Sequence, residues 1–406
     1  MRFADALAAP GFGAVAEFKR RSPSGGDLRP HGDVAATARA YESAGARAMS
    51  VLVDERFAGS WDDLRSARAA ATLPLLAKGF FSTPAHLREA RDAGADAVLL
   101  LLRDLDDTRC AELLAEAAAL GLDTLVEAHD GDELDRAVQL GAPVIGINAR
   151  NLADFSIDRD TQLELVARAP RDRVVVAESG IFTRAQAAAA ELSGANAALV
   201  GSALMTAPDP GAKLRDLFAR PLVKICGLTR QIDVDAAVDA GADLVGFILA
   251  KESPRRAAGL LDAPPTVLRV AVFVGETAET DADLVQFYGR EDGHRTRDAV
   301  LLRGDAHVGS VVDLPWAETD PRHLDRARAT NGRVMLAGGL GPDNVRAAIE
   351  TVQPWAVDSA RSTESSPGVK DHDAVRAWVK AASGVGSTEP DKSGGAGSAG
   401  VGAGAA

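Results

Sequence analysis

The sequence of 406 residues contains only two cysteines, Cys110 and Cys226. Two cysteines are too few for a disulfide framework or a thiolate metal site, and such scarcity is typical of a reducing compartment. The chain also lacks the run of 18 or more apolar residues that a membrane-spanning helix needs. Its first residues do not show the basic and then apolar pattern of a secretory signal peptide. We therefore expect a cytoplasmic protein.

The sequence also has fewer basic than acidic residues. Lys and Arg number 45 against 58 Asp and Glu, which gives a formal net charge of −13. An acidic surface repels nucleic acid and anionic membranes, so neither is an expected partner. Hydrophobic residues at 46% and charged residues at 25% are ordinary for a globular protein. The composition favours a protein that acts on small molecules, with a monomer as the simplest assembly.

What the chain does have is an internal repeat. A glycine that ends a predicted helix and precedes an apolar strand recurs at Gly45, Gly94, Gly141, Gly194 and Gly241. Glycine after a helix supplies the left-handed cap that side chains disfavour. One further strand lies between successive glycines in the first half, so the repeating unit is a strand plus a helix of about 25 residues.

Eight apolar strands are predicted in the first module. They are Ala14–Phe18, Met49–Val53, Leu75–Phe80, Val98–Leu102, Thr124–Glu127, Val144–Ile147, Val174–Ala177 and Ala198–Val200. Apolar strands that alternate with amphipathic helices indicate a parallel sheet covered on both faces. Eight such units fit a closed (β/α)8 barrel over residues 1–218. No Gly-x-Gly-x-x-Gly turn follows the first strand, which argues against a dinucleotide-binding fold.

A second module is predicted over residues 222–383, so the fold class is α/β with two tandem TIM-type barrels. Seven strands are expected: Val223–Cys226, Val245–Leu249, Leu268–Val274, Leu284–Phe287, Ala299–Leu302, Val334–Ala337 and Ala356–Asp358. The segment from Gly289 to Asp298 is too short for a strand–helix unit. Either this barrel is incomplete, with about seven strands, or a neighbouring segment fills the gap. Residues 384–406 are rich in Gly, Ala and Ser and are predicted to be a disordered tail.

Polar side chains gather at the predicted C-terminal strand ends of the first module, where such barrels carry their sites. They are Glu17, Lys19, Lys78, Glu127, Asn148 and Arg150. One alone would be an ion pair on the rim, but six together indicate a functional site. Ser179-Gly180 and Gly201-Ser202 follow the last two strands, where barrels commonly bind phosphate. Without a metal cluster, this set suits acid–base chemistry on a phosphorylated anionic sugar derivative.

Four segments of this module resemble indole-3-glycerol phosphate synthases. They are Ala16–Ser24, Leu125–His129, Ile145–Leu152 and Ala177–Ile181. The resemblance covers nearly all of residues 8–218. It implies that a carboxyphenylamino-deoxyribulose phosphate is decarboxylated and closed to indole-3-glycerol phosphate, without a cofactor or a metal.

The resemblance also implies roles for individual residues. Lys78 resembles the general acid that activates the ketone, while Lys19 holds the anthranilate carboxylate and serves the acid–base steps with Glu17 and Glu127. Asn148 and Arg150 orient these groups. The positions that the family uses to line the pocket or hold the phosphate are Ser22, Phe80, Glu178, Ser179, Gly180, Gly201 and Ser202. His129, close to this set, is interpreted as a solvated loop residue.

Two departures from the family pattern stand out. Gly79 follows Lys78 where the family has aspartate, and the helical extension that covers the substrate in the family is missing before the first strand. Loss of such a lid is expected to weaken substrate binding more than the chemistry.

The second module resembles phosphoribosylanthranilate isomerases. The segments that carry this likeness are Val223–Arg230, Ser253–Arg255, Val285–Gly289, Leu336–Leu340 and Glu364–Asp371. It implies the Amadori rearrangement of N-(5-phosphoribosyl)anthranilate to 1-(2-carboxyphenylamino)-1-deoxyribulose 5-phosphate. Cys226, which alone would be read as a buried structural thiol, becomes the general base. Arg255 would grip the anthranilate carboxylate, and Gly338 and Gly339 the phosphate.

The general acid of this family is harder to find. Arg303 stands where the aspartate is expected, so Asp305, two residues later, is predicted to take the role, with Asp313 as the alternative. The last phosphate loop reads Ala360-Arg361-Ser362 instead of Ser-Ser-Gly.

Three hypotheses follow. The first is a bifunctional tryptophan-biosynthesis enzyme that acts on small phosphorylated anthranilate-sugar substrates. The second is a synthase with a degenerate C-terminal module, and the third a non-catalytic phosphosugar-binding scaffold, which the complete set of polar residues in the first module disfavours.

Overall fold

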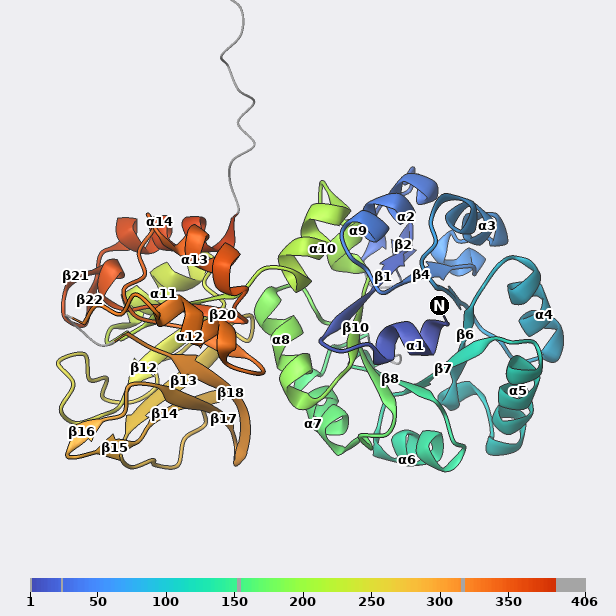
Figure 1. The fold of residues 1–406 in the computed structure, drawn as a ribbon. Helices are drawn as coiled ribbons and strands as arrows, with labels where there is room; N and C mark the ends of the chain where they lie inside the picture. The colour runs from blue at the N-terminus through green and yellow to red at the C-terminus, as the bar shows by residue number, and fades with distance from the viewer. Residues whose placement is uncertain (1, 23–24, 152–154, 315–317, 385–406) are drawn as a thin grey trace, which may run out of the picture.

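The computed structural model describes residues 2–22, 25–151, 155–314 and 318–384. Two closed barrels of eight strands lie next to each other (Figure 1). The prediction of tandem α/β barrels is therefore confirmed. The predicted tail, apart from Gly384, lies outside the described residues. Within these described ranges, no helix combines the length and apolar character needed to cross a membrane.

The first barrel is an all-parallel ring. Its strands are β1 (Gly13–Phe18), β4 (Ala48–Leu52), β5 (Leu75–Lys78), β6 (Ala97–Leu101), β7 (Asp123–Ala128), β8 (Val144–Asn148), β9 (Val174–Glu178) and β10 (Ala197–Val200). They follow one another around the ring in chain order, and β10 pairs with β1 to close it. All eight predicted strands are present.

Helices cover the outside of this ring. They are α2 (Val34–Ser43), α3 (Trp61–Ala70), α4 (Pro84–Asp92), α5 (Asp107–Ala119), α6 (Gly131–Gln139), α7 (Arg159–Arg168), α8 (Arg184–Ser193), α9 (Ser202–Met205) and α10 (Pro210–Phe218). Asp or Ser/Thr side chains cap the N-termini of most of them; Asp130, for example, accepts from the amide of Glu133 at the start of α6. The five repeated glycines all have positive φ, between 75° and 110°. The local signals of the sequence thus set the helix ends.

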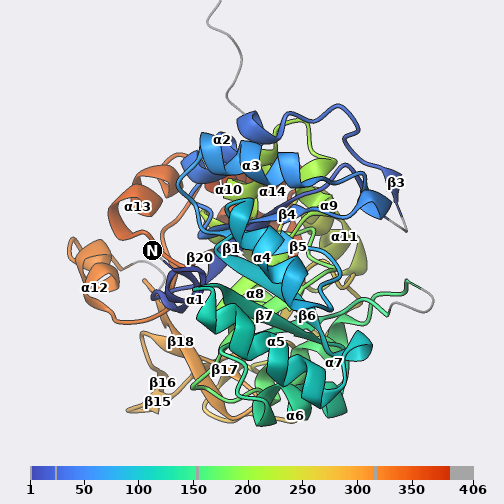
Figure 2. The same ribbon diagram turned by 90° about the vertical axis from the view of Figure 1, so that its right-hand side faces the viewer.

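The helix before the first strand, α1 (Phe3–Ala8), closes the bottom of the first barrel. Its Phe3 and Leu7 side chains are fully buried. The amide of Ala4 donates to Asp123 Oδ2 at 3.0 Å, and Asp123 is the first residue of β7. Figures 1 and 2 show α1 across one end of the ring. Because the strands start at that end, α1 lies opposite the mouth and does not cover a site there.

The second barrel also has eight strands, so the prediction of about seven is wrong. The strands are β11 (Leu222–Cys226), β12 (Leu244–Ile248), β13 (Leu268–Val274), β14 (Leu284–Tyr288), β17 (Ala299–Arg303), β18 (Ala306–Val312), β19 (Val334–Leu336) and β20 (Ala356–Ser359). The missed strand is β18. It follows β17 through the two-residue turn Gly304-Asp305, with Gly304 at φ 54°, and β17 runs antiparallel to both of its neighbours.

A short hairpin replaces the expected strand–helix unit between Gly289 and Asp298. Its strands are β15 (Arg290–Glu291) and β16 (His294–Arg295). The helices of this barrel are α11 (Gln231–Asp239), α12 (His323–Ala329), α13 (Val345–Val352) and α14 (His372–Ser383). Between α11 and α12 the described residues form no helix. The unit is absent, as the spacing predicts, and the antiparallel β17 lets the ring close without it.

Helix α8 of the first barrel covers the bottom of the second. Ala185, Ala188 and Ala189 share a hydrophobic cluster with residues at the start of the second barrel's strands, among them Leu222 and Leu244. Arg303 donates to the Ala189 carbonyl at 3.0 Å. Because Arg303 ends β17, this contact shows that β17 runs from the mouth towards the bottom. The two barrels share a core through α8, which lies between them in Figure 1.

Candidate active sites

Lys78 is at the centre of the first barrel's mouth. Its Nζ lies 2.7 Å from Glu178 Oε2, 3.5 Å from Glu17 Oε2 and 3.9 Å from Glu127 Oε2. Lys19 adds a second ammonium, 2.7 Å from Glu17 Oε1. Three carboxylates from three strands therefore share two lysines within one buried cluster.

The charges in this cluster separate the pKa values of its carboxyl groups. Burial alone would raise the pKa of Glu17, but Lys19 and Lys78 outweigh it and lower this pKa. Burial raises the pKa of Glu178, and Lys78 only partly opposes that effect. Burial would lower the pKa of Lys78, yet the surrounding glutamates raise it. Carboxyl groups with pKa values pushed apart are suited to different acid and base roles.

Neighbouring side chains contact the Glu127 carboxylate at one of its two oxygens, Oε1. Its Oε1 accepts from Asn148 Nδ2 at 2.9 Å, and the Asn148 side chain is itself fixed by the amide of Arg150, which donates to Oδ1 at 2.9 Å. His129 Nε2 lies 3.1 Å from the same Oε1. Burial would raise the pKa of Glu127, but His129, Lys78 and Asn148 lower it. Glu127 is thus kept ionised.

The interpretation of His129 as a solvated loop residue is wrong. Its side chain is only 16% exposed, and its Nδ1 lies 3.0 Å from Glu133 Oε2. The sequence contains a usable signal: His129 follows Glu127 by two residues at a strand end, and Glu133 follows His129 by four at the start of a helix.

Glycines make room for the charged groups inside the ring. A Cβ on Gly201 would come within 2.3 Å of Glu17 Oε1, and one on Gly146 within 2.1 Å of Glu178 Oε1. Gly79, the departure beside Lys78, is also confined, since a Cβ there would meet Val53 at 3.1 Å. Glycine at 79 therefore fits this chain's own packing. The sequence alone does not predict that position 146 needs glycine, because the side chain that approaches it, Glu178, comes from the neighbouring strand β9.

The loops after β9 and β10 also line the cavity at this mouth. Ser179 and Gly180 have φ values of 69° and 72°. Two successive left-handed residues, one of them not glycine, are unusual and are often found at functional sites. Gly201 is the N-cap of the short helix α9, which begins at Ser202. This is the place where barrels of this kind commonly bind phosphate.

The structure brings the predicted residues of the first module together. One cavity is lined by Glu17, Lys19, Ser22, Lys78, Phe80, Glu127, Asn148, Arg150, Ser179, Gly180, Gly201 and Ser202. Glu178 contacts this cavity's Lys78 at the end of β9.

The second barrel contains a chain of hydrogen bonds that crosses its interior. Fully buried Lys224 donates to Gln286 Oε1 at 2.6 Å and to Asp358 Oδ2 at 3.0 Å. Gln286 donates to the hydroxyl of Tyr288 at 2.8 Å, and Tyr288 donates to Asp313 Oδ2 at 3.0 Å. These strand residues connect one wall of the barrel to the other.

Cys226 ends β11 beside this chain and is 5% exposed. Burial raises the pKa of its thiol, and Lys224 opposes that effect. Cys226 lines a cavity of about 870 Å³ that also contains Asp313, Asp358 and Arg255, together with Gly338 and Gly339. The Nε of Arg255 donates to both oxygens of Glu364 at 2.9 Å.

Asp305 does not lie at this mouth, so its prediction as the general acid is wrong. It is exposed in the turn between β17 and β18. Because β17 is antiparallel, that turn lies at the bottom of the barrel, next to α8. Asp313 instead follows the last residue of β18, the sixth strand around the ring, and faces the cavity with Cys226.

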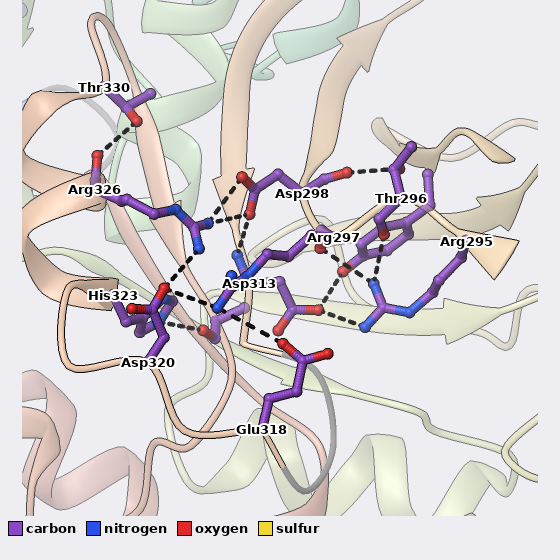
Figure 3. Close-up of polar contacts among 12 residues, drawn as sticks. Arg295, Thr296, Arg297, Asp298, Asp313, Glu318, Asp320, His323, Arg326 and Thr330 are labelled. Carbon is purple, nitrogen blue, oxygen red and sulfur yellow. Dashed lines mark hydrogen bonds and ion pairs between the residues drawn. The ribbon is translucent and has the colours of Figure 1, made fainter. Parts of the chain in front are cut away.

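Charged residues hold Asp313 in place (Figure 3). Arg295, from the replacement hairpin, lies 3.0 Å from Asp313 Oδ2 and stacks over the Tyr288 ring at 4.3 Å. The Asp313 amide donates to Asp298 Oδ1 at 3.0 Å, and Arg326 of α12 binds Asp298 at 2.7 Å. The hairpin segment and α12 thereby stabilise the end of β18 in the absence of a helix.

These two mouths define a class of protein. Each barrel places buried acids and bases, together with loop glycines, around a cavity at the mouth of its ring. The chain is thus a barrel enzyme of the kind that performs acid–base chemistry on small substrates.

The family matches specify the class further. Residues 1–217, more than half of the chain, match indole-3-glycerol phosphate synthase, and the chain belongs to this family. Residues 307–381 match N-(5'-phosphoribosyl)anthranilate isomerase. The chain combines both in a bifunctional enzyme of tryptophan biosynthesis.

Solved phosphoribosylanthranilate isomerases are similar to part of the chain. The Thermotoga maritima enzyme is 28% identical over 41% of this chain and 100% of its own, with a TM-score of 0.33. The Thermus thermophilus enzyme is 27% identical over 39% of this chain and 97% of its own, also at 0.33. An isomerase solved with reduced 1-(o-carboxyphenylamino)-1-deoxyribulose 5-phosphate has the same coverage and identity as the first. With scores this low, the family matches alone identify the chain.

Proposed function

We propose that the first barrel, residues 1–218, closes the indole ring with Lys78 as general acid. The contact of cavity-lining Lys78 with three buried carboxylates carries this assignment. Lys78 would protonate the ketone oxygen as the ring closes, while Lys19 holds the substrate carboxylate until it leaves as carbon dioxide. Glu127 and Glu17 take and return protons during dehydration.

The remaining first-barrel residues bind and orient. Asn148 fixes the Glu127 carboxylate, and Arg150 lines the cavity beside it. The residues proposed to hold the phosphate or line the pocket are Ser22, Phe80, Glu178, Ser179, Gly180, Gly201 and Ser202.

For the second barrel, residues 222–383, we propose Cys226 as the base that removes the C2 proton and Asp313 as the acid that opens the furanose. The shared cavity of Cys226 and Asp313 supports this pairing. Arg255 would exchange Glu364 for the substrate carboxylate, because guanidinium suits a planar anion. Gly338 and Gly339, with φ values of 81° and 66°, would receive the phosphate.

We further propose that the enzyme works in the cytoplasm, as a monomer, on phosphorylated anthranilate sugars. The net charge of −13 supports small substrates over nucleic acid or anionic membranes as partners. The product of the second barrel is the substrate of the first.

Separate assays of the two half-reactions test the assignment. The intact chain is expected to turn over both substrates, and Cys226→Ser is expected to lower isomerase kcat about 100-fold or more, because a hydroxyl is a far weaker acid than a thiol and yields little anion to act as base. Synthase turnover of the same variant serves as the folding control. Absence of isomerase turnover by the intact chain would instead favour a degenerate second module.

We expect the synthase kcat/KM to depend on the ionisation of the Glu178 carboxyl. Burial raises the pKa of Glu178 to about 7. Above that pH the ionised carboxylate holds the Lys78 proton more firmly, so kcat/KM is expected to fall as the pH rises. Glutamine stays uncharged at every pH and mimics the protonated form, so the alkaline limb that Glu178 causes should be absent in Glu178→Gln. Profiles of synthase kcat/KM against pH test this prediction, with Glu112→Gln on the surface of α5 as the control. An alkaline limb that is the same in Glu178→Gln as in the unmodified chain contradicts it.

A further inference from the structure

His129 lies directly behind the proposed base of the synthase. It follows the last residue of β7, and its side chain is 16% exposed. One ring nitrogen, Nδ1, hydrogen-bonds Glu133 Oε2 at 3.0 Å. The other, Nε2, lies 3.1 Å from Glu127 Oε1, within ion-pair distance but without hydrogen-bond geometry among the described residues. The imidazole therefore stands between two carboxylates from different elements.

This arrangement determines the charge of the ring. A neutral imidazole has one N–H and one lone pair, so one of its nitrogens would direct a lone pair at an anion. Only the imidazolium presents an N–H on both sides. The attraction of both carboxylates accordingly outweighs burial and raises the pKa of His129 to about 10.

The ring also distinguishes the two oxygens of Glu127. Oε1 is engaged by Asn148 at 2.9 Å and faces His129. Oε2 is buried, makes no hydrogen bond among the described residues, and lies on the side of Lys78, 3.9 Å away. A carboxylate anchored through one oxygen leaves the other as its basic atom.

His129 is itself held from behind. Glu133, in the first turn of α6, accepts from the amide of His129 at 2.8 Å as well as facing its ring. The neighbouring 3-10 helix Leu102–Asp104 carries Arg103 and Asp104, which pair with each other near the surface. Inside the mouth the nearest other charges belong to Lys78 and Glu178. The ring is thus hydrogen-bonded to Glu133 and lies at ion-pair distance from Glu127.

We propose that His129 is a positioning residue of the synthase: as an imidazolium, it keeps Glu127 ionised and turned so that Oε2 faces the reacting atoms. The proposal rests on the role of Glu127 in the proposed function. It adds a further cation, besides Lys19, Lys78 and Arg150, to the site that contains the three carboxylates.

The charge of the ring is tested without turnover. In NMR spectra of the full chain, the His129 ring signals, identified by their loss in His129→Gln among seven histidines, should remain those of an imidazolium at about pH 8.5, well above the ordinary histidine pKa. Glu133→Gln should make the ring titrate at lower pH. A His129 ring that titrates near the ordinary value in the unmodified chain overturns the proposal.

Activity tests the positioning. His129→Gln is expected to lower synthase kcat about 10- to 100-fold with little change in KM, the cost of a misplaced catalytic group. It should also move the acidic limb of the pH profile upward, because Glu127 loses the cation that favours its ionised form. Isomerase turnover of the same variant reports on folding, and His31→Gln in an exposed loop is the matched control.

Two outcomes separate the proposal from the function it rests on. Unchanged kcat and an unchanged pH profile in His129→Gln overturn the positioning role. An active Glu127→Gln enzyme overturns the role of Glu127 instead, and the NMR result for the His129 charge still holds.

Discussion

Replacing Lys78 with alanine is expected to lower synthase kcat/KM about 1000-fold while isomerase turnover of the same chain is unchanged. The reason is the position of the ammonium group, 2.7 Å from Glu178 and within 4 Å of Glu17 and Glu127. No other cation of the described residues contacts all three carboxylates. Lys19 cannot take its place, because among the described residues its ammonium pairs with only one of the three carboxylates, that of Glu17.

The measurement is a synthase assay on the purified product of the isomerase step, so that the two barrels are tested independently. Lys380→Ala, at an exposed position of α14, is the control for loss of a lysine. Loss of isomerase turnover together with synthase turnover would mean that the substitution disturbs the shared core. Retention of about a tenth or more of synthase activity would remove Lys78 from the role of general acid.

The first barrel could be predicted from the sequence because each of its signals is local. A capped helix and a buried apolar strand follow one another in the repeating unit, with a glycine of positive φ between them in most units, and the residue at a strand's end marks the mouth. The cavity-lining residues were found in this way, from Glu17 on β1 to Ser202 on α9. Parallel strands of one ring necessarily bring such positions together.

The sequence does not predict His129 and Gly146 as residues of the site, because their roles depend on contacts between different helices and strands. His129 is significant only once α6 brings Glu133 to the second ring nitrogen. Glycine is required at position 146 because the Glu178 carboxylate, from the next strand, lies where a Cβ atom would be. The four-residue spacing of His129 and Glu133 indicates the first contact, but nothing in a single sequence indicates the second.

The second barrel departs from its prediction for a different reason. If all its strands were parallel, Asp305, which follows the predicted strand Ala299–Leu302, would lie at the mouth. The two-residue turn Gly304-Asp305 between apolar runs is itself a hairpin signal. A hairpin reverses β17, sends Asp305 to the bottom of the ring and brings the end of β18 to the mouth.

This reversal yields a paired prediction for the isomerase. Asp313→Asn is expected to lower isomerase kcat about 100- to 10,000-fold, whereas Asp305→Asn leaves it unchanged. Asparagine has the size of aspartate and still accepts from Tyr288, but it has no acidic proton to give to the ring oxygen of the furanose. Asp305 is exposed beside α8, at the end of the ring remote from Cys226, and cannot reach a substrate there.

Isomerase kcat and KM of both variants check this prediction, with synthase turnover as the folding control in each. Because Arg295 pairs with Asp313 at 3.0 Å, substrate binding has to displace that guanidinium before the Asp313 carboxyl can contact the furanose oxygen. Arg295→Gln should therefore raise isomerase kcat only where Asp313 is intact. Loss of activity in Asp305→Asn with an active Asp313→Asn would contradict the antiparallel arrangement of β17 itself, since the acid would then have to lie at the end of that strand.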